Sequence, residues 1–245
     1  MDFLKEYDRL KSQRFPITET LHFSYELGKS ADIELHFQLY CMDQALPRGM
    51  RGDIENHFDK HGPAGIEYLR GLLDDPDRTK AINAAYLMAE MIRKLRWSGR
   101  DEAERDLRCG LVRLSSEAQP EIRRKSIIAL GWVGTACEIP LLCGHLLHDE
   151  DALCRAWSAS CFLQMCGRVP ADVMQPMIRD ALLQCLISEE DAFVCGVAIE
   201  ACGDVWNKKL RLRDADIENR NEAAIAKAKK RAMSLLQKAT PAASS

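Results

Sequence analysis

The sequence lacks the patterns that most often mark an enzyme or a membrane protein. No H-E-x-x-H, G-x-S-x-G, P-loop or G-x-G-x-x-G motif occurs in its 245 residues, so the common signatures of zinc proteases, α/β-hydrolases and nucleotide-binding folds are absent. No run approaches the roughly 18 apolar residues that a membrane-spanning helix needs, and the N-terminus has no signal-peptide core. We therefore expect a soluble, cytoplasmic, non-enzymatic protein without a cofactor.

The ten cysteines lack the spacings of common metal and redox sites. No C-x-x-C pair occurs, which excludes zinc ribbons and thioredoxin-like motifs, and without a signal peptide we expect a reducing compartment. Several cysteines stand in apolar runs where Ala or Leu would be usual, and a free cysteine packs as a small hydrophobe. We therefore predict a core-filling role for Cys154, Cys161, Cys166, Cys195 and Cys202.

One metal-ligand pattern remains. Cys143, His145 and His148 lie within six residues, with the two histidines about one helical turn apart. A structural zinc site needs a fourth ligand at a suitable spacing, and none follows. The favoured interpretation is that both histidines occupy a groove or the core.

Charge gives little support for a polyanionic partner. The net charge is −3 and the isoelectric point about 6.1, whereas nucleic-acid binding relies on concentrated positive charge. The basic clusters at 93–97, 123–125 and 208–211 are short and are typical of solvated helix faces. With 47% hydrophobic and 29% charged residues, the chain can bury a substantial core.

Four acidic turns follow segments that end in Leu or Ile. When that last apolar residue is aligned, the spacings are 41, 33 and 40 residues, close to the period of two-helix repeats. Each turn carries Asp, Glu or Pro where the next helix must begin, which suits the free N–H groups of a helix N-terminus. The turns are LLDDPD (72–77), RLSSEAQPE (113–121), LLHDED (146–151) and LISEED (186–191).

The helices expected after these turns resemble each other. IRRKSIIALGWVG (122–134) resembles the first helix of a HEAT repeat, and 79–91, 154–167 and 194–206 resemble it more loosely. Their small residues allow close helix packing, and we expect the glycines at their ends to form left-handed caps. The resemblance covers roughly 62–210 and implies an all-α, right-handed α-α superhelix, a HEAT-like solenoid.

Second helices are expected at 65–73, 102–114, 139–147 and 172–187. A last helix at about 214–238 begins with acidic residues and becomes basic later, which matches the helix dipole and suits a capping helix. The HEAT-like region is therefore assigned to residues 62–238, and ATPAASS (239–245) is expected to be a disordered tail.

The N-terminal segment 1–61 is open to two interpretations. Residues 17–41 contain two alternating apolar runs that would suit a β-hairpin turning at Gly28. The alternative is a helix pair, with Ser30 or Asp32 capping a second helix that runs to about Leu46. The helical interpretation is favoured because the rest of the chain is predicted to be helical.

The expected function is to bind one partner protein on the concave surface, which second helices line in a solenoid. Charges of both signs on these helices suit a protein better than a polyanion, and Trp97, taken as exposed, would serve as an aromatic anchor. The predicted partner-binding residues are Glu67, Arg70, Trp97, Glu102, Arg105, His148, Arg179 and Asp180.

Known proteins on this scaffold suggest more specific roles. The size resembles that of small bacterial HEAT proteins that neutralise a cognate toxin, and also that of HEAT subunits of phycobilin lyases. The alternative class is a HEAT-type nucleic-acid-binding protein or DNA glycosylase, which would require a basic groove. HEAT-type iron hydroxylases use His-Glu pairs, and this chain has no His-Glu dipeptide.

Overall fold

A computed structural model describes residues 2–44, 46, 50, 52–95 and 97–238. The chain divides into two compact units, residues 1–110 (unit 1) and 111–245 (unit 2). The predicted boundary after residue 61 falls inside unit 1 and stays a prediction. The predicted tail at 239–245 lies outside the described residues.

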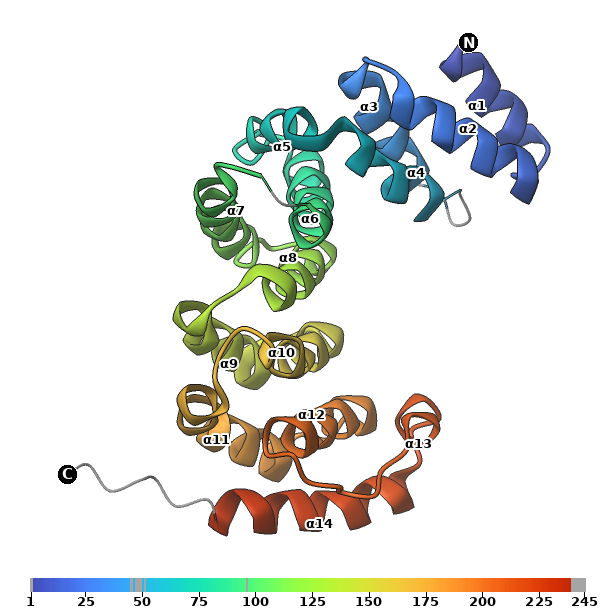
Figure 1. Cartoon of the computed structure of the whole chain (residues 1–245). Helices are drawn as coiled ribbons and strands as arrows, with labels where there is room; N and C mark the ends of the chain where they lie inside the picture. The colour runs from blue at the N-terminus through green and yellow to red at the C-terminus, as the bar shows by residue number, and fades with distance from the viewer. Residues whose placement is uncertain (1, 45, 47–49, 51, 96, 239–245) are drawn as a thin grey trace. The chain divides into compact units, whose positions relative to one another are not determined.

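Every regular element in the described part of the chain is helical, so the predicted all-α fold is confirmed (Figure 1). No helix there is long and apolar enough to cross a membrane. The α-helices of unit 1 are α1 (Phe3–Ser12), α2 (Ile17–Lys29), α3 (Ile33–Gln44), α4 (Gly52–His57), α5 (Gly62–Arg70) and α6 (Arg78–Lys94), with the 3-10 helix η1 (Phe58–His61). Helix α7 (Arg100–Leu114) spans the division, and unit 2 continues with α8 (Pro120–Val133), η2 (Ala136–Glu138), α9 (Ile139–His148), α10 (Ala152–Met165), α11 (Ala171–Ser188), α12 (Ala192–Val205), α13 (Asp214–Glu218) and α14 (Glu222–Lys238).

Unit 2 is built as two rows of adjacent helices. Helix α10 packs most extensively on α8 and α12, while α9 packs on α10 and α11 (Figure 1). Close approach depends on small residues: a Cβ on Gly131 would lie only 3.0 Å from the Cys161 sulfur, and one on Gly196 only 2.8 Å from the Ile217 side chain. The repeated small-residue patches in the sequence therefore mark the contacts between neighbouring layers.

The expected left-handed glycine caps are wrong. Gly134, which follows α8, has φ −65° and ψ 161°, and among the described glycines only Gly62 and Gly99 have positive φ. A Cβ on Gly134 would lie 2.5 Å from the carbonyl oxygen of Leu130. This glycine is thus required by the close approach of the chain to the helix end.

The last helical segment also differs from the prediction of one helix over 214–238. It is divided into α13 and α14 by a turn in which Arg220 has φ 50°. Asn221 causes the break, because its N–H donates to the Asp216 carbonyl and its Oδ1 accepts from the N–H of Ala224, so it caps a new helix. Helix α14 packs against α11 and α12.

The N-terminal alternation belongs to helices, and the helical interpretation of 17–41 is confirmed. Gly28 lies in the last turn of α2, where α4 comes so close that a Cβ would be 2.6 Å from the His57 carbonyl oxygen. Asp32 caps α3 by accepting from the N–H of Leu35 at 2.9 Å. The described helix ends at Gln44, slightly before the predicted Leu46.

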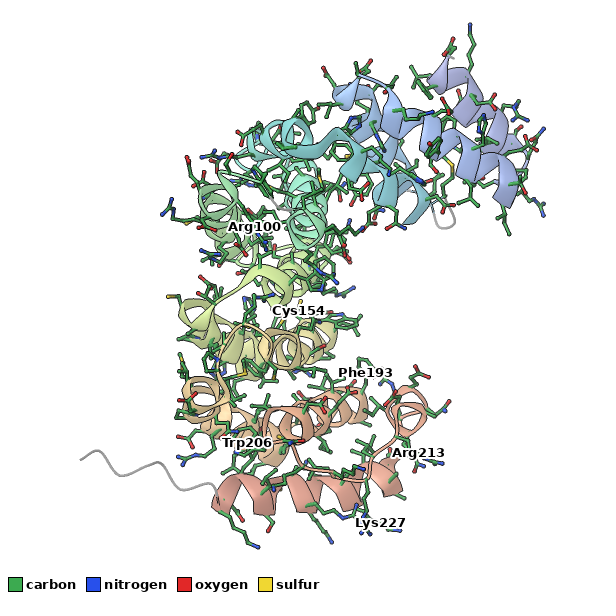
Figure 2. All side chains as sticks on the ribbon, in the orientation of Figure 1. Arg100, Cys154, Phe193, Trp206, Arg213 and Lys227 are labelled. Atoms are coloured by element: carbon green, nitrogen blue, oxygen red, sulfur yellow. The ribbon has the colours of Figure 1, made fainter. Side chains whose placement is uncertain are left out.

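Most of the cysteines predicted to fill the core do so. Cys154, Cys161, Cys195 and Cys202 are buried, and Cys154 lies between α10 and α8, where its thiol donates to the Pro120 carbonyl (Figure 2). Burial raises the pKa of Cys161 and of Cys202 to about 12. Cys166 is exposed, and that prediction is wrong because its helix ends one residue earlier.

A pair of histidines forms a polar contact inside unit 1. His36 Nδ1 lies 2.8 Å from His61 Nε2, and His36 Nε2 lies 3.1 Å from the carbonyl oxygen of Ile54. Because a carbonyl can only accept, the neutral His36 carries its proton on Nε2 and accepts at Nδ1 from His61. Burial lowers the pKa of His36 to about 3 and lowers the pKa of His61 as well.

Two buried cysteines offer a matched test of packing. Cys161 donates to the Ile127 carbonyl at 3.0 Å, so a serine there retains a hydrogen-bond acceptor, whereas no protein acceptor contacts the Cys202 thiol in the described structure. We expect Cys202→Ser to lower the free energy of unfolding by about 1–3 kcal/mol and Cys161→Ser to lower it less. Urea unfolding measures both, with the alanine variants as controls; a smaller loss for Cys202→Ser than for Cys161→Ser would contradict this account.

The buried histidine predicts acid sensitivity of unit 1. The folded-state pKa of His36 lies below the ordinary value of 6.5, so the unfolded chain takes up a proton first as the pH falls, and stability is lost from about pH 6.5 downward. For one such group the loss is up to about 1.4 kcal/mol per pH unit. Urea unfolding at several pH values should show a shallower dependence for His36→Gln than for the parent protein, while the exposed His22→Gln should match the parent.

Candidate functional site

Arg123 joins two successive turns of unit 2. It lies near the start of α8, and its Nη1 donates to the carbonyl oxygens of Glu117 at 2.9 Å and Ala118 at 2.8 Å, both in the turn before α8. Its Nε and Nη2 donate to the carboxylate of Asp149, in the turn after α9, at 3.0 and 2.8 Å. Burial by itself would raise the pKa of Asp149, but the Arg123 hydrogen bonds hold it below its ordinary value.

Arg155 repeats this arrangement one repeat later. Its Nη1 donates to the carbonyl oxygens of Asp149 and Glu150, and its Nε and Nη2 donate to the carboxylate of Glu189 at 2.7 and 3.0 Å. The Arg123 and Arg155 side chains are only 9% and 19% exposed. We call these two arginines, with the turns that they join, the arginine clamps.

Other arginines strengthen the same stack. Arg124 makes a two-pronged contact with Asp151, at 2.7 and 2.6 Å, and Asp151 caps α10 by accepting from the N–H of Cys154. At the other end of the layer, Arg168 donates to the last carbonyl groups of α8, including that of Gly131 at 2.7 Å. Helix α8 is therefore held at both ends.

The arginine clamps border two clefts, which we call the first and second turn clefts. The first, of about 720 Å³, lies between the turn 115–118, one side of α9 and the turn 149–150. The second, of about 380 Å³, lies between 146–149 and the turn 188–191. The two clefts are formed by equivalent turns of consecutive repeats, and His148 and Asp149 contribute to both.

The three residues of the metal pattern point to different partners. His145 Nδ1 lies 2.9 Å from an Asp149 carboxylate oxygen, Cys143 donates to the Met177 carbonyl, and His148 is exposed in the wall of both clefts. Among the described residues, no group of three or more His, Cys, Asp or Glu side chains is arranged to hold a metal ion.

In unit 1, the predicted residues of α5 and α7 are brought together. Arg70 binds Glu102 at 2.6 Å and lies 3.6 Å from Glu67, and its Nε donates to Asp106 at 2.7 Å. This network links α5 to α7. Arg105, on α7, is exposed and makes no hydrogen bond or ion pair with the described residues.

The remaining predicted residues are placed as follows. Arg179 is half-buried on α11 and pairs with the adjacent, exposed Asp180 at 2.8 Å. Trp97 is half-buried rather than exposed, and the indole nitrogen lies 3.8 Å from the Cβ position of Gly99. Trp97 is therefore less exposed than expected, and its role as an aromatic anchor stays a prediction.

Sequence reasoning assigned no binding role to the outer residues of the turn clefts. Glu150 and Glu190 are exposed in these clefts, one in each of two successive acidic turns. The turns were recognised only as helix starts. The sequence does contain a signal for such a role: a carboxylate recurs at the same position of consecutive turns. Helix capping alone does not require this recurrence.

The family comparison agrees with this architecture. Residues 66–162 match the family model for HEAT repeats, a stretch that begins in α5 and ends in α10. No curated protein and no solved structure shows significant similarity to the chain. The resemblance inferred from the sequence is thereby confirmed over this stretch: residues 66–162 are similar to HEAT repeats.

Proposed function

We propose that the chain is a non-enzymatic scaffold that holds one partner protein. HEAT repeats commonly serve as protein-interaction scaffolds. The observation that carries the proposal is the charge of both signs exposed on the second helices, such as Arg105 on α7 and Asp180 on α11. Such a mixed, repeated surface suits a protein with its own charge pattern.

The partner contacts the second helices, which the sequence analysis assigns to the concave face. In unit 1 the candidate contacts are the exposed charges of α5 and α7; in unit 2 they are the exposed residues of α9 and α11, with His148. Arg105 is the strongest candidate on α7, because no carboxylate of the described chain neutralises it. Arg70 belongs to the proposed surface too, although it also links two helices.

A nucleic-acid partner has less support. In the basic cluster at 123–125, Arg123 and Arg124 bind Asp149 and Asp151. In the cluster at 93–97, the side chain of Arg93 lies 3.1 Å from Glu90. Arg93, Arg123 and Arg124 are thus directed to the chain's own carboxylates. A salt-dependent DNA titration should show no specific binding.

Within the class of protein partners, we place a cognate bacterial toxin or other enzyme first. The basis is analogy with small HEAT proteins that neutralise one toxin, together with the acidic net charge of −3. A pull-down from the source cell, analysed by mass spectrometry, should recover a single enzyme in stoichiometric amount whose activity falls on binding. Recovery of a bound protein whose activity is unchanged would remove the inhibitor role and leave the scaffold role.

Charge reversal tests the proposed surface. Arg105→Glu and Arg179→Glu should each weaken the complex with the recovered partner by about 2–5 kcal/mol, or about 30-fold or more in Kd, if the arginine meets a buried carboxylate there. Isothermal titration calorimetry measures the affinity, and thermal unfolding should give an unchanged Tm.

Lys230→Glu, on the exposed side of α14, is the matched control and should leave the affinity unchanged. Lys229 is less suitable because its amino group lies 3.9 Å from the Cys195 sulfur. If both arginine reversals leave the affinity unchanged while changes in residues 1–61 abolish it, the proposed face is wrong.

A further inference from the structure

The turn clefts form a short periodic surface along one edge of unit 2. Each cleft opens between two successive turns, and the same residue, His148, lies in the wall of both. Periodicity of this kind suits a ligand that is itself extended and periodic, such as a segment of polypeptide, better than a compact small molecule.

Along this edge, the positive side chains are buried or half-buried and the exposed carboxylates lie at the surface. The cationic groups that line the clefts, Arg123 and Arg155, are turned inward and are neutralised by Asp149 and Glu189, which are themselves 2% and 9% exposed. Glu150, 81% exposed, lies 3.4 Å from Arg123 at the outside, and Glu190 is exposed on the next turn. Apart from the histidines, the exposed charges lining the clefts are therefore negative.

His145, in the wall of the first turn cleft, has a ring nitrogen that makes no hydrogen bond with the described residues. His145 Nδ1 faces an Asp149 carboxylate oxygen at 2.9 Å, so the proton of the neutral imidazole is on Nδ1 and Nε2 is an acceptor. Nε2 is buried and has no hydrogen-bond partner among the described residues, and His145 lines this cleft. An entering N–H donor, neutral or cationic, would satisfy it, and a carboxylate or phosphate oxygen would not.

The repeat spacing restricts the conformation of the ligand. The clefts follow one another by one helix layer, and packed helices lie about 8–10 Å apart. A polyproline II segment rises about 3.1 Å per residue with three residues per turn, so side chains at i and i+3 lie on one face about 9 Å apart. A β-strand places residues i and i+3 on opposite faces.

We infer that the turn clefts bind an extended, basic segment of the partner protein, with Lys or Arg side chains three residues apart entering the first and second turn clefts. Glu150 and Glu190, which are exposed at the outside of the clefts, attract the two cations. The inference rests on the proposed scaffold function and adds the chemistry of what is bound.

A peptide titration tests it. The probe is a proline-rich peptide with lysines at positions i and i+3. The control peptide has the same composition, with the lysines at i and i+2. Fluorescence anisotropy measures the binding of each peptide to the full chain. The i, i+3 peptide should bind at least about fivefold tighter at an ionic strength of about 50 mM, and its affinity should fall steeply with added salt because exposed charges are screened.

The double variant Glu150→Lys/Glu190→Lys should bind this peptide at least about fivefold more weakly than the parent protein. Its Tm should be unchanged. Glu218→Lys, an exposed carboxylate on α13 that lines neither cleft, should not weaken the binding. Equal binding of the two peptides, no binding of either, or indifference to the double reversal would overturn the inference.

The partner recovered by pull-down separates the two proposals. If the Glu150/Glu190 reversals leave its affinity unchanged while Arg105→Glu lowers it, the scaffold function stands and the turn clefts are not the binding surface. If no protein partner is recovered but the peptide results hold, the cleft chemistry stands without the proposed partner.

Discussion

Arg123 and Arg155 join the turns of consecutive repeats in unit 2. In a repeat array each layer contacts only its neighbours, so no distant contact can correct an error in the spacing of two layers. Each clamp guanidinium donates backward to carbonyl groups of its own turn and forward to the carboxylate of the next turn. The planar, five-donor geometry of arginine allows one side chain to do both, which lysine could not.

The clamps also determine the electrostatic character of the surface. The buried carboxylates of Asp149 and Glu189 neutralise the two clamp arginines. The positive charge of these arginines therefore faces the interior of unit 2. The carboxylates that remain outside, such as Glu150, then dominate the turn edge. The same contacts that hold the layers together therefore support the proposal of a protein partner with basic side chains rather than a polyanion.

Unit 1 is stabilised differently before residue 66, where the match to HEAT repeats begins. Its interior combines aromatic rings with a buried polar pair: the rings of His36 and Phe58 lie 4.7 Å apart, and His36 also contacts His61. The burial of this pair makes unit 1 lose stability as the pH falls below about 6.5, whereas the lowered pKa of Asp149 delays the loss of its contribution in unit 2 to lower pH. In unit 2, the arginine clamps are already charged at every ordinary pH.

The sequence by itself determined the helical class, the repeat period and the helix starts, because these depend on local spacing and capping residues such as Asp32 and Asp151. It did not distinguish hairpin from helix at Gly28, whose role is the close approach of α4. The sequence also did not reveal that Arg123 and Arg155 join successive turns or that Glu150 remains exposed to solvent. Arginine and glutamate are equally suited to a solvated helix face. Only the tertiary structure decides these points, because the partners of each arginine are 5–6 residues before it and 26–34 residues after it, and packing brings them together.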